Sequence, residues 1–222
     1  GAFNDNPNPG PFHFGWGVYN PADNVIRGDS IFIVKAGSDY YKFMIDSLES
    51  QTFTWHLRYQ KFDLISQTQV ATITKNPTFN DRLFAYFNLS TGQELDREPA
   101  INDWDLVFTQ YMHTFYDSDP YVYYSVNGVL LNPKDVKAAL VADKNYADIS
   151  IDDISANPLS GFWNTIGYDW KTFDFTTELY QIDFNKSYLL LDRKGFYYKL
   201  RFTDFYNSSG IKGYPKFEFE KL

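Results

Sequence analysis

Residues 30–46 read SIFIVKAGSDYYKFMID, and residues 187–203 read SYLLLDRKGFYYKLRFT. Aligned without a gap, the two stretches share their first serine and a Tyr-Tyr-Lys sequence after the turn. Each is an apolar run, then a polar turn that contains glycine, then an aromatic-rich run, which is the pattern of a β-hairpin. Internal duplication and convergence of two amphipathic hairpins both explain the match. Under either explanation, the pattern predicts a chain built mostly from strands.

The rest of the chain carries further strand patterns between turn residues. In Phe53–Tyr59, large apolar residues alternate with Thr54, His56 and Arg58, as expected for a strand with one buried face. Asn127-Gly128 lies between two apolar runs and predicts a tight hairpin turn. The predicted strands cover residues 16–19, 53–59, 69–74, 82–88, 102–111, 121–126, 129–131, 180–184, 188–191, 197–202 and 216–220, with a further short strand near 149–151.

One helix is predicted after the Asn127-Gly128 segment. Asn132 can cap it, Pro133 suits its first position, and an apolar face continues to about Val141. The predicted fold class is therefore all-β, with mostly antiparallel strands and hairpins and one or two short helices. The length of 222 residues allows one large β domain or two intimate halves. We expect a single domain over residues 16–222, preceded by a flexible polar tether over residues 1–15.

Composition and charge narrow the classes of function. Hydrophobic residues make up 44% of the chain and aromatic residues 20%, which is typical of a globular protein. The formal net charge is −8 and the basic residues are scattered singly, which disfavours binding to nucleic acid or to an anionic membrane surface. The absence of cysteine excludes a disulfide scaffold, thiolate metal sites and a cysteine nucleophile. No run of about 18 apolar residues exists, so we expect no segment that spans a bilayer.

Catalytic signatures are missing from the sequence, and we predict a protein that is not an enzyme. There is no nucleophile elbow, no P-loop and no dinucleotide-binding glycine pattern. The carboxylate pairs Asp103/Asp105, Asp117/Asp119 and Asp152/Asp153 are expected by chance among 28 acidic residues.

Side chains that could bind haem iron are few: His13, Met44, His56, Met112 and His113. The adjacent Met112 and His113 are the most informative, because they end a predicted strand and enter the aromatic loop TFYDSDPYVYY. That loop could cover a flat apolar ligand. The alternative is a purely structural role for both residues.

Three segments together resemble the HmuY family of Bacteroidetes haem-binding lipoproteins. They read NDWDLVFTQY (102–111), IGYDWKTFDF (166–175) and FYYKLRFTDFYNSSGIKGYPKFEFE (196–220). The resemblance implies an all-β, non-enzymatic hemophore for iron acquisition. It also implies a lipoprotein attached through a cysteine that this sequence does not contain, displayed at the outer membrane or secreted. Its implied partners are haem, a host haem carrier and an outer-membrane receptor.

The resemblance also implies positions for two axial haem ligands. The first position follows the strand resembling Trp104–Tyr111, so Met112 or His113 stands there. The second lies in the region resembling 135–150, which contains neither His nor Met and offers Tyr146 as an iron ligand by type. One ligand is therefore missing, supplied by another loop, or replaced because the cargo differs. The aromatic side chains expected to line the cargo pocket are Phe115, Tyr116, Tyr121 and Tyr123.

Two functions follow from these observations. The first is binding of haem or another porphyrin at the cell surface. The second keeps the same fold but gives it a glycan, a peptide or a partner protein as cargo, because the tyrosine clusters at 121–124 and 197–198 suit such contacts.

Overall fold

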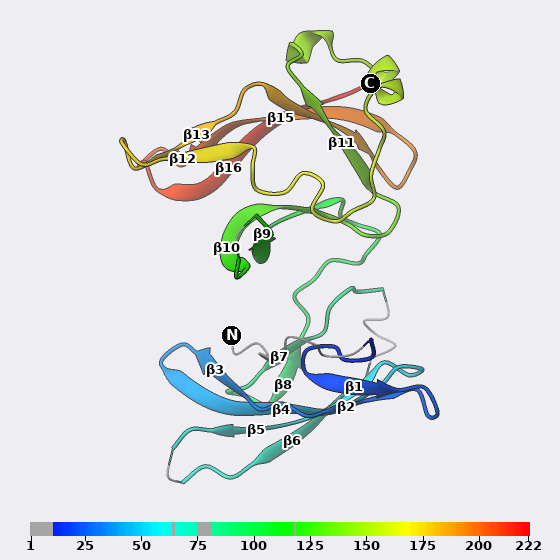
Figure 1. The fold of residues 1–222 in the computed structure, drawn as a ribbon, viewed down its shortest axis with the longest axis vertical. Helices are drawn as coiled ribbons and strands as arrows, with labels where there is room; N and C mark the ends of the chain where they lie inside the picture. The colour runs from blue at the N-terminus through cyan, green and yellow to red at the C-terminus, as the bar shows by residue number, and fades with distance from the viewer. Residues whose placement is uncertain (1–10, 64, 75–80, 118) are drawn as a thin grey trace. The chain divides into compact units, whose positions relative to one another are not determined.

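The structure is a computed structural model that describes residues 11–63, 65–74, 81–117 and 119–222. It divides into two compact units, residues 1–100 and residues 101–222, which are described separately below. Both units are built from antiparallel strands (Figure 1). The described residues contain no helix longer than a 3-10 turn, which confirms the all-β fold class. Residues 1–10 of the predicted tether lie outside the described part of the chain.

The N-terminal unit contains a six-stranded sheet and a small two-stranded one. The large sheet has the order β1-β2-β4-β5-β6, and β3 also pairs with the long strand β4. Leu57 and Tyr59 are buried with Tyr41 and Ile73, and Trp55 packs against them, so the predicted core face is confirmed from Trp55 onward. The predicted start at Phe53 is wrong, because Phe53 precedes β5, has a φ of +52° and is exposed. The strands of this unit are β1 (Gly17–Asn20), β2 (Val25–Gly28), β3 (Phe32–Ala36), β4 (Asp39–Glu49), β5 (Thr54–Lys61), β6 (Gln69–Thr74), β7 (Tyr86–Asn88) and β8 (Gln93–Leu95).

The predicted strand over residues 82–88 is wrong at its start, because strand geometry begins only at Tyr86. The buried carboxylate of Glu98 accepts hydrogen bonds from the backbone nitrogens of Leu83 (3.1 Å) and Phe84 (2.8 Å). A side chain thus satisfies these donors, and a neighbouring strand is not needed for them.

The C-terminal unit contains a two-stranded ribbon, a four-stranded sheet and a second small ribbon. The four-stranded sheet has the order β11-β14-β15-β16, and two 3-10 turns follow β11. The elements are β9 (Leu106–Phe115) and β10 (Val122–Leu131) in the β9–β10 ribbon; β11 (Lys137–Ala142), β14 (Lys186–Leu191), β15 (Tyr197–Tyr206) and β16 (Lys212–Lys221) in the sheet; β12 (Lys171–Asp174) and β13 (Leu179–Ile182); and the turns η2 (Tyr146–Asp148) and η3 (Ile151–Ser155).

Strands β11 and β14 of the four-stranded sheet are covered on both faces, whereas the edge strand β16 is exposed. One face packs with Val129 and Leu131 of β10 around Trp170 and Phe202. The opposite face carries alternate residues of the same strands, and it packs against Ile149 and the 3-10 turns. The β9–β10 ribbon and the 3-10 turns therefore lie on opposite sides of this sheet, as Figure 1 also shows.

Both hairpins predicted from the matching sequences are confirmed, as β3–β4 and β14–β15. Their registers differ, however. Ala36 pairs with Asp39 across a two-residue turn, whereas the second hairpin has a three-residue turn, residues 193–195, closed where the nitrogen of Asp192 donates to the carbonyl of Phe196. The aligned lysines also differ, because Lys42 is exposed, whereas Lys199 is buried on the face of its sheet that the 3-10 turns cover.

The helix predicted over residues 132–141 is wrong. Asn132 caps a tight turn, and strand β11 begins five residues later at Lys137. The neighbours Ala138 and Ala139 are both buried, on opposite faces of the sheet. A strand that is buried on both faces has a continuous apolar run, which sequence periodicity does not separate from a short helix.

The predicted hairpin turn at Asn127-Gly128 is also wrong. Both residues lie inside β10, where Asn127 pairs with Gln110 and Gly128 pairs with Thr109. The short strand expected near residues 149–151 is likewise wrong, because Ile149 and Ser150 connect η2 to η3 and Ile151 begins η3.

Candidate functional site

The predicted ligands Met112 and His113 lie near the end of β9. In the antiparallel register, Met112 pairs with Ser125 and His113 pairs with Tyr124. Successive side chains of a strand point to opposite faces. The sulfur and the imidazole therefore lie on opposite faces of the ribbon, although the two residues are adjacent in sequence.

The imidazole of His113 is held between aromatic rings. The ring of Phe115, two residues along the same face, lies 4.8 Å from it in a T-shaped arrangement. The ring of Tyr168 lies at the same distance, 4.8 Å, from another part of the chain. These contacts restrict the imidazole orientation and leave the residue partly exposed.

Tyr168 is a site residue that sequence reasoning missed. It follows Gly167, whose φ of +66° is a conformation that glycine adopts readily. Gly167 and Val129 exchange backbone hydrogen bonds of 2.8 and 3.1 Å, which fix this segment beside β10. Burial raises the pKa of the Tyr168 hydroxyl, and Asp169 and Asp117 raise it further. The phenol is therefore held in its neutral form.

Met112 occupies the more polar face of the ribbon, and half of its surface is exposed. Its neighbours along β9 on this face are Gln110 and Thr114, and Ser125 lies opposite it. A thioether in such a position is accessible to a ligand from solvent, whereas His113 is more firmly oriented.

The four predicted pocket aromatics are distributed around the same end of the ribbon. Phe115 lies on the His113 face. Tyr123 is paired with Thr114 and lies on the Met112 face. Tyr116 and Tyr121 follow at the tip, where their rings meet at 5.3 Å. The exposed rings make this end of the ribbon an unusually apolar surface.

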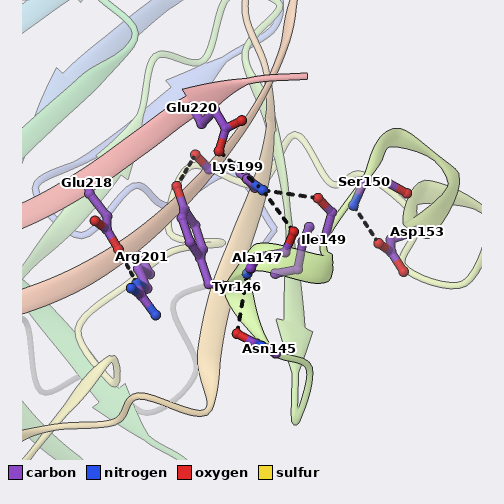
Figure 2. A network of polar contacts seen from close by, with 10 residues as sticks. All are labelled: Asn145, Tyr146, Ala147, Ile149, Ser150, Asp153, Lys199, Arg201, Glu218 and Glu220. Atoms are coloured by element: carbon purple, nitrogen blue, oxygen red, sulfur yellow. Dashed lines mark hydrogen bonds and ion pairs between the residues drawn. The ribbon is translucent and has the colours of Figure 1, made fainter.

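Tyr146 is not near these residues, because it lies in η2 across the four-stranded sheet from the ribbon. Its hydroxyl donates to the backbone carbonyl of Lys199 at 3.2 Å. The Lys199 ammonium and the Arg201 guanidinium lie 5.0 Å and 4.5 Å from the centre of its ring (Figure 2). The structure thus brings Tyr146 together with neither Met112 nor His113.

The surroundings of Tyr146 favour a neutral phenol. Burial raises its pKa, the carboxylates of Glu218 and Glu220 raise it further, and Arg201 acts in the opposite direction. Those carboxylates also form ion pairs, Glu218 with Arg201 and Glu220 with Lys199, the latter at 3.3 Å. Lys199 donates as well to the carbonyls of Ala147 (3.5 Å) and Ile149 (3.4 Å). The network in Figure 2 therefore ties η2 to β15 and β16.

No group of three or more His, Asp or Glu residues suited to hold a metal ion is found in residues 11–63, 65–74, 81–117 and 119–222. Within the same residues, no helix is long and apolar enough to cross a membrane.

Comparison with known proteins identifies one family. The family model described as HmuY protein matches residues 80–219, which is more than half of the chain. The match includes the β9–β10 ribbon, both 3-10 turns and all of the four-stranded sheet except the last two residues of β16. Searches of the curated proteins and of the solved structures found no significant match.

Proposed function

The chain belongs to the HmuY family, and from this premise we propose that it is a non-enzymatic haem- or porphyrin-binding protein for iron acquisition. Proteins of this family are haem-binding and hemophore-like, and they are surface lipoproteins. We place this protein at the outer membrane through a lipid anchor, or outside the cell. In that role it takes haem from a host carrier and delivers it to an outer-membrane receptor.

The observation that carries the proposal is the end of the β9–β10 ribbon. It presents a nitrogen donor, a sulfur donor and several aromatic rings together. Haem iron accepts both donor types, and the flat macrocycle gains from burial against aromatic surfaces. The donor atoms at this end of the ribbon therefore suit haem iron, and the aromatic rings suit the porphyrin plane.

We assign the axial ligand to His113 and a secondary role to Met112. The two side chains lie on opposite faces of β9, so one iron is not held by both in this backbone conformation. Phe115 and Tyr168 already orient the imidazole, which lowers the entropy lost when it binds iron. Met112 then offers a soft sulfur that suits ferrous iron better than ferric iron.

Titration with ferric and ferrous haem tests the assignment, with the Soret band as readout. Wild-type protein should shift the band, and His113→Ala should weaken ferric binding by at least tenfold. Met112→Ala should change the spectrum of the ferrous complex more than that of the ferric complex. His56→Ala and Met44→Ala are matched controls from the N-terminal unit and should leave both titrations unchanged. No shift for wild-type protein, or an unchanged titration for the double variant of Met112 and His113, contradicts the assignment.

A different cargo is the second candidate, because the exposed tyrosines Tyr116, Tyr121, Tyr123 and Tyr124 also suit contact with a glycan, a peptide or a partner protein. Glycan arrays and mass spectrometry of molecules that copurify with the protein separate the two functions. Specific retention of a glycan or peptide by a protein that leaves the Soret band unchanged favours this second function.

A further inference from the structure

The C-terminal unit contains a groove of about 430 Å³ that the proposed haem site does not use. Segment 103–108 forms one wall, and β14, β15 and β16 form the others. We call it the acidic groove, because three aspartates line it beside an apolar floor. Its volume lies within the range of small-molecule sites. The floor consists of Leu106, Val136, Leu190, Leu191 and Leu200.

Aromatic rings form the walls above this floor. Phe108 of β9 and Phe217 of β16 are stacked, with ring centres 5.3 Å apart and planes 19° apart. Phe219 continues the wall toward Tyr198, whose ring centre lies 6.2 Å from its own. Phe217 and Phe219 remain partly exposed, so the walls keep apolar surface that a further ring could contact. Such surfaces favour a flat, apolar ligand.

The polar groups of the groove are acidic. Asp103, Asp105 and Asp192 line it, and none of them is in an ion pair among the described ion pairs of the chain. Arg193 is close, but its guanidinium donates to the carbonyl of Ile101 (2.8 Å) and the side chain of Asn102 (2.6 Å). The carboxylates therefore have no ion-pair partner among the described ion pairs, although one oxygen of Asp192 accepts from the backbone nitrogens of Lys194 and Phe196 at 2.8 Å.

The pKa of the Asp105 carboxyl is raised, as expected for a desolvated acid close to another acid. Burial raises the pKa of its carboxyl, and the negative charge of Asp192 raises it further. Arg193 and Lys194 lower the same pKa, but they do not cancel the increase. A cation beside Asp105 and Asp192 would relieve their repulsion.

One more group in the groove lacks a partner. The indole nitrogen of Trp104 is buried and has no hydrogen-bond acceptor among the described residues. A buried donor without a partner is costly, but this nitrogen is closed to solvent, so a ligand would reach it only after the indole shifts.

We propose that the acidic groove binds a small aromatic molecule that carries one protonated amine. Its ring packs on Phe108, Phe217 and Phe219, and its ammonium group lies beside Asp105 and Asp192. The site is distinct from the haem site, because the same carboxylates repel the propionates of a porphyrin.

The test compares three probes with the same ring system: 1-naphthylmethylamine, 1-naphthylmethanol and 1-naphthoate. Isothermal titration calorimetry gives the affinities, and amide chemical shifts in two-dimensional NMR locate the site. We expect the amine to bind at least fivefold more tightly than the alcohol, and the carboxylate most weakly. Amide shifts for the amine should concentrate in residues 103–108, 190–200 and 217–219.

Variants separate the charge from the ring surface. Asp105→Asn should bring the amine close to the alcohol in affinity, whereas Phe217→Ala should weaken both probes. Asp152→Asn, an exposed acid in η3, is the matched control and should change neither. Haem titrations should stay unchanged in all three variants, so failure of the haem proposal is recognised independently. Absence of amine binding at millimolar concentration, or equal affinity for amine and alcohol in wild-type protein, overturns the proposal.

Discussion

Gly128 and Gly167 lie so close that a side chain on Gly128 has no room. A Cβ atom built on Gly128 would lie 2.6 Å from the carbonyl oxygen of Gly167 and 2.9 Å from the ring of Tyr111. The contact is the place where segment 164–170 joins β10, through the hydrogen bonds between Gly167 and Val129. Glycine at position 128 therefore serves a close approach of two backbones, and it does not form a turn.

Gly128→Ala should destabilise the C-terminal unit by about 2–3 kcal/mol, because the added methyl group must push two backbones apart. Urea denaturation followed by tryptophan fluorescence measures the change. The matched control is Gly161→Ala, where the nearest atom to the new Cβ is Lys137 Cγ at 4.0 Å. That variant should change the free energy of unfolding by less than about 1 kcal/mol. Equal effects of the two substitutions would contradict the close-approach role.

Asn132 should be one of the most sensitive polar positions in the chain. It is fully buried, and its amide donates to the carbonyls of Ile101 (2.7 Å) and Trp104 (2.8 Å). Its side-chain oxygen accepts from the nitrogen of Lys134 at 3.0 Å. Asn132→Ala should lower the free energy of unfolding by about 2–4 kcal/mol, because it leaves buried groups without partners.

Two further variants show whether hydrogen bonding or volume causes that loss. Asn132→Asp keeps the shape but places a carboxylate against two carbonyls, so it should destabilise at least as much at pH 7. Exposed Asn185 is the control, and Asn185→Ala should be nearly neutral. A stable Asn132→Asp variant would rule out the hydrogen-bond explanation.

Local patterns in the sequence predicted the strands well where one face is buried. The alternation from Trp55 to Tyr59 and the two matching hairpins needed only the period of a strand. The failures occurred where the same local signal has two meanings. Asn127-Gly128 is a turn signal, yet Gly128 is needed because its backbone packs against Gly167. Gly167 lies 39 residues later in the chain, so a local sequence pattern does not reveal this contact.

In the candidate site, too, local patterns were readable from the sequence and contacts between distant segments were not. Met112, His113 and the loop aromatics were predicted from the sequence because they are nearly contiguous in it. Tyr168 was missed because its contact with His113 depends on how segment 164–170 docks on β10. Tyr146 was proposed by residue type and position alone, and only the folded sheet places it across from the ribbon. Contacts between distant segments are set by packing, which single-residue types do not encode.

The hydroxyl of Tyr111 offers a stabilising substitution next to the candidate ligands. It is buried and has no hydrogen-bond partner among the described residues. Tyr111→Phe removes this unpaired group without creating a cavity, so it should raise the free energy of unfolding by about 1 kcal/mol. Tyr206→Phe is the contrast, because the Tyr206 oxygen accepts from the nitrogen of Tyr180 at 2.6 Å. That variant should be destabilised, and a loss of stability in both would contradict the prediction.

Lys171 should make the stability of the C-terminal unit depend on pH in the alkaline range. The side chain is only 6% exposed, and its ammonium lies 4.1 Å from the ring of Trp170 and 4.7 Å from that of Phe205. It donates to the carbonyls of Asn127 (2.6 Å) and Tyr168 (3.2 Å). Burial lowers its pKa to about 8 from the usual 10.5, with Asp169 acting in the opposite direction.

The sign of the effect follows from proton binding. Between pH 8 and 10.5 the unfolded chain holds a proton on Lys171 that the folded protein has released, so stability increases as pH rises. The full difference is on the order of 3 kcal/mol, and the cost is fully present below pH 8. Urea denaturation at pH 7, 8 and 9 avoids the range in which tyrosines ionise. The free energy of unfolding should rise over this range in wild-type protein and rise less in Lys171→Met. Parallel curves for the two proteins would show that Lys171 keeps its proton in the folded state and that its two carbonyl hydrogen bonds outweigh its burial.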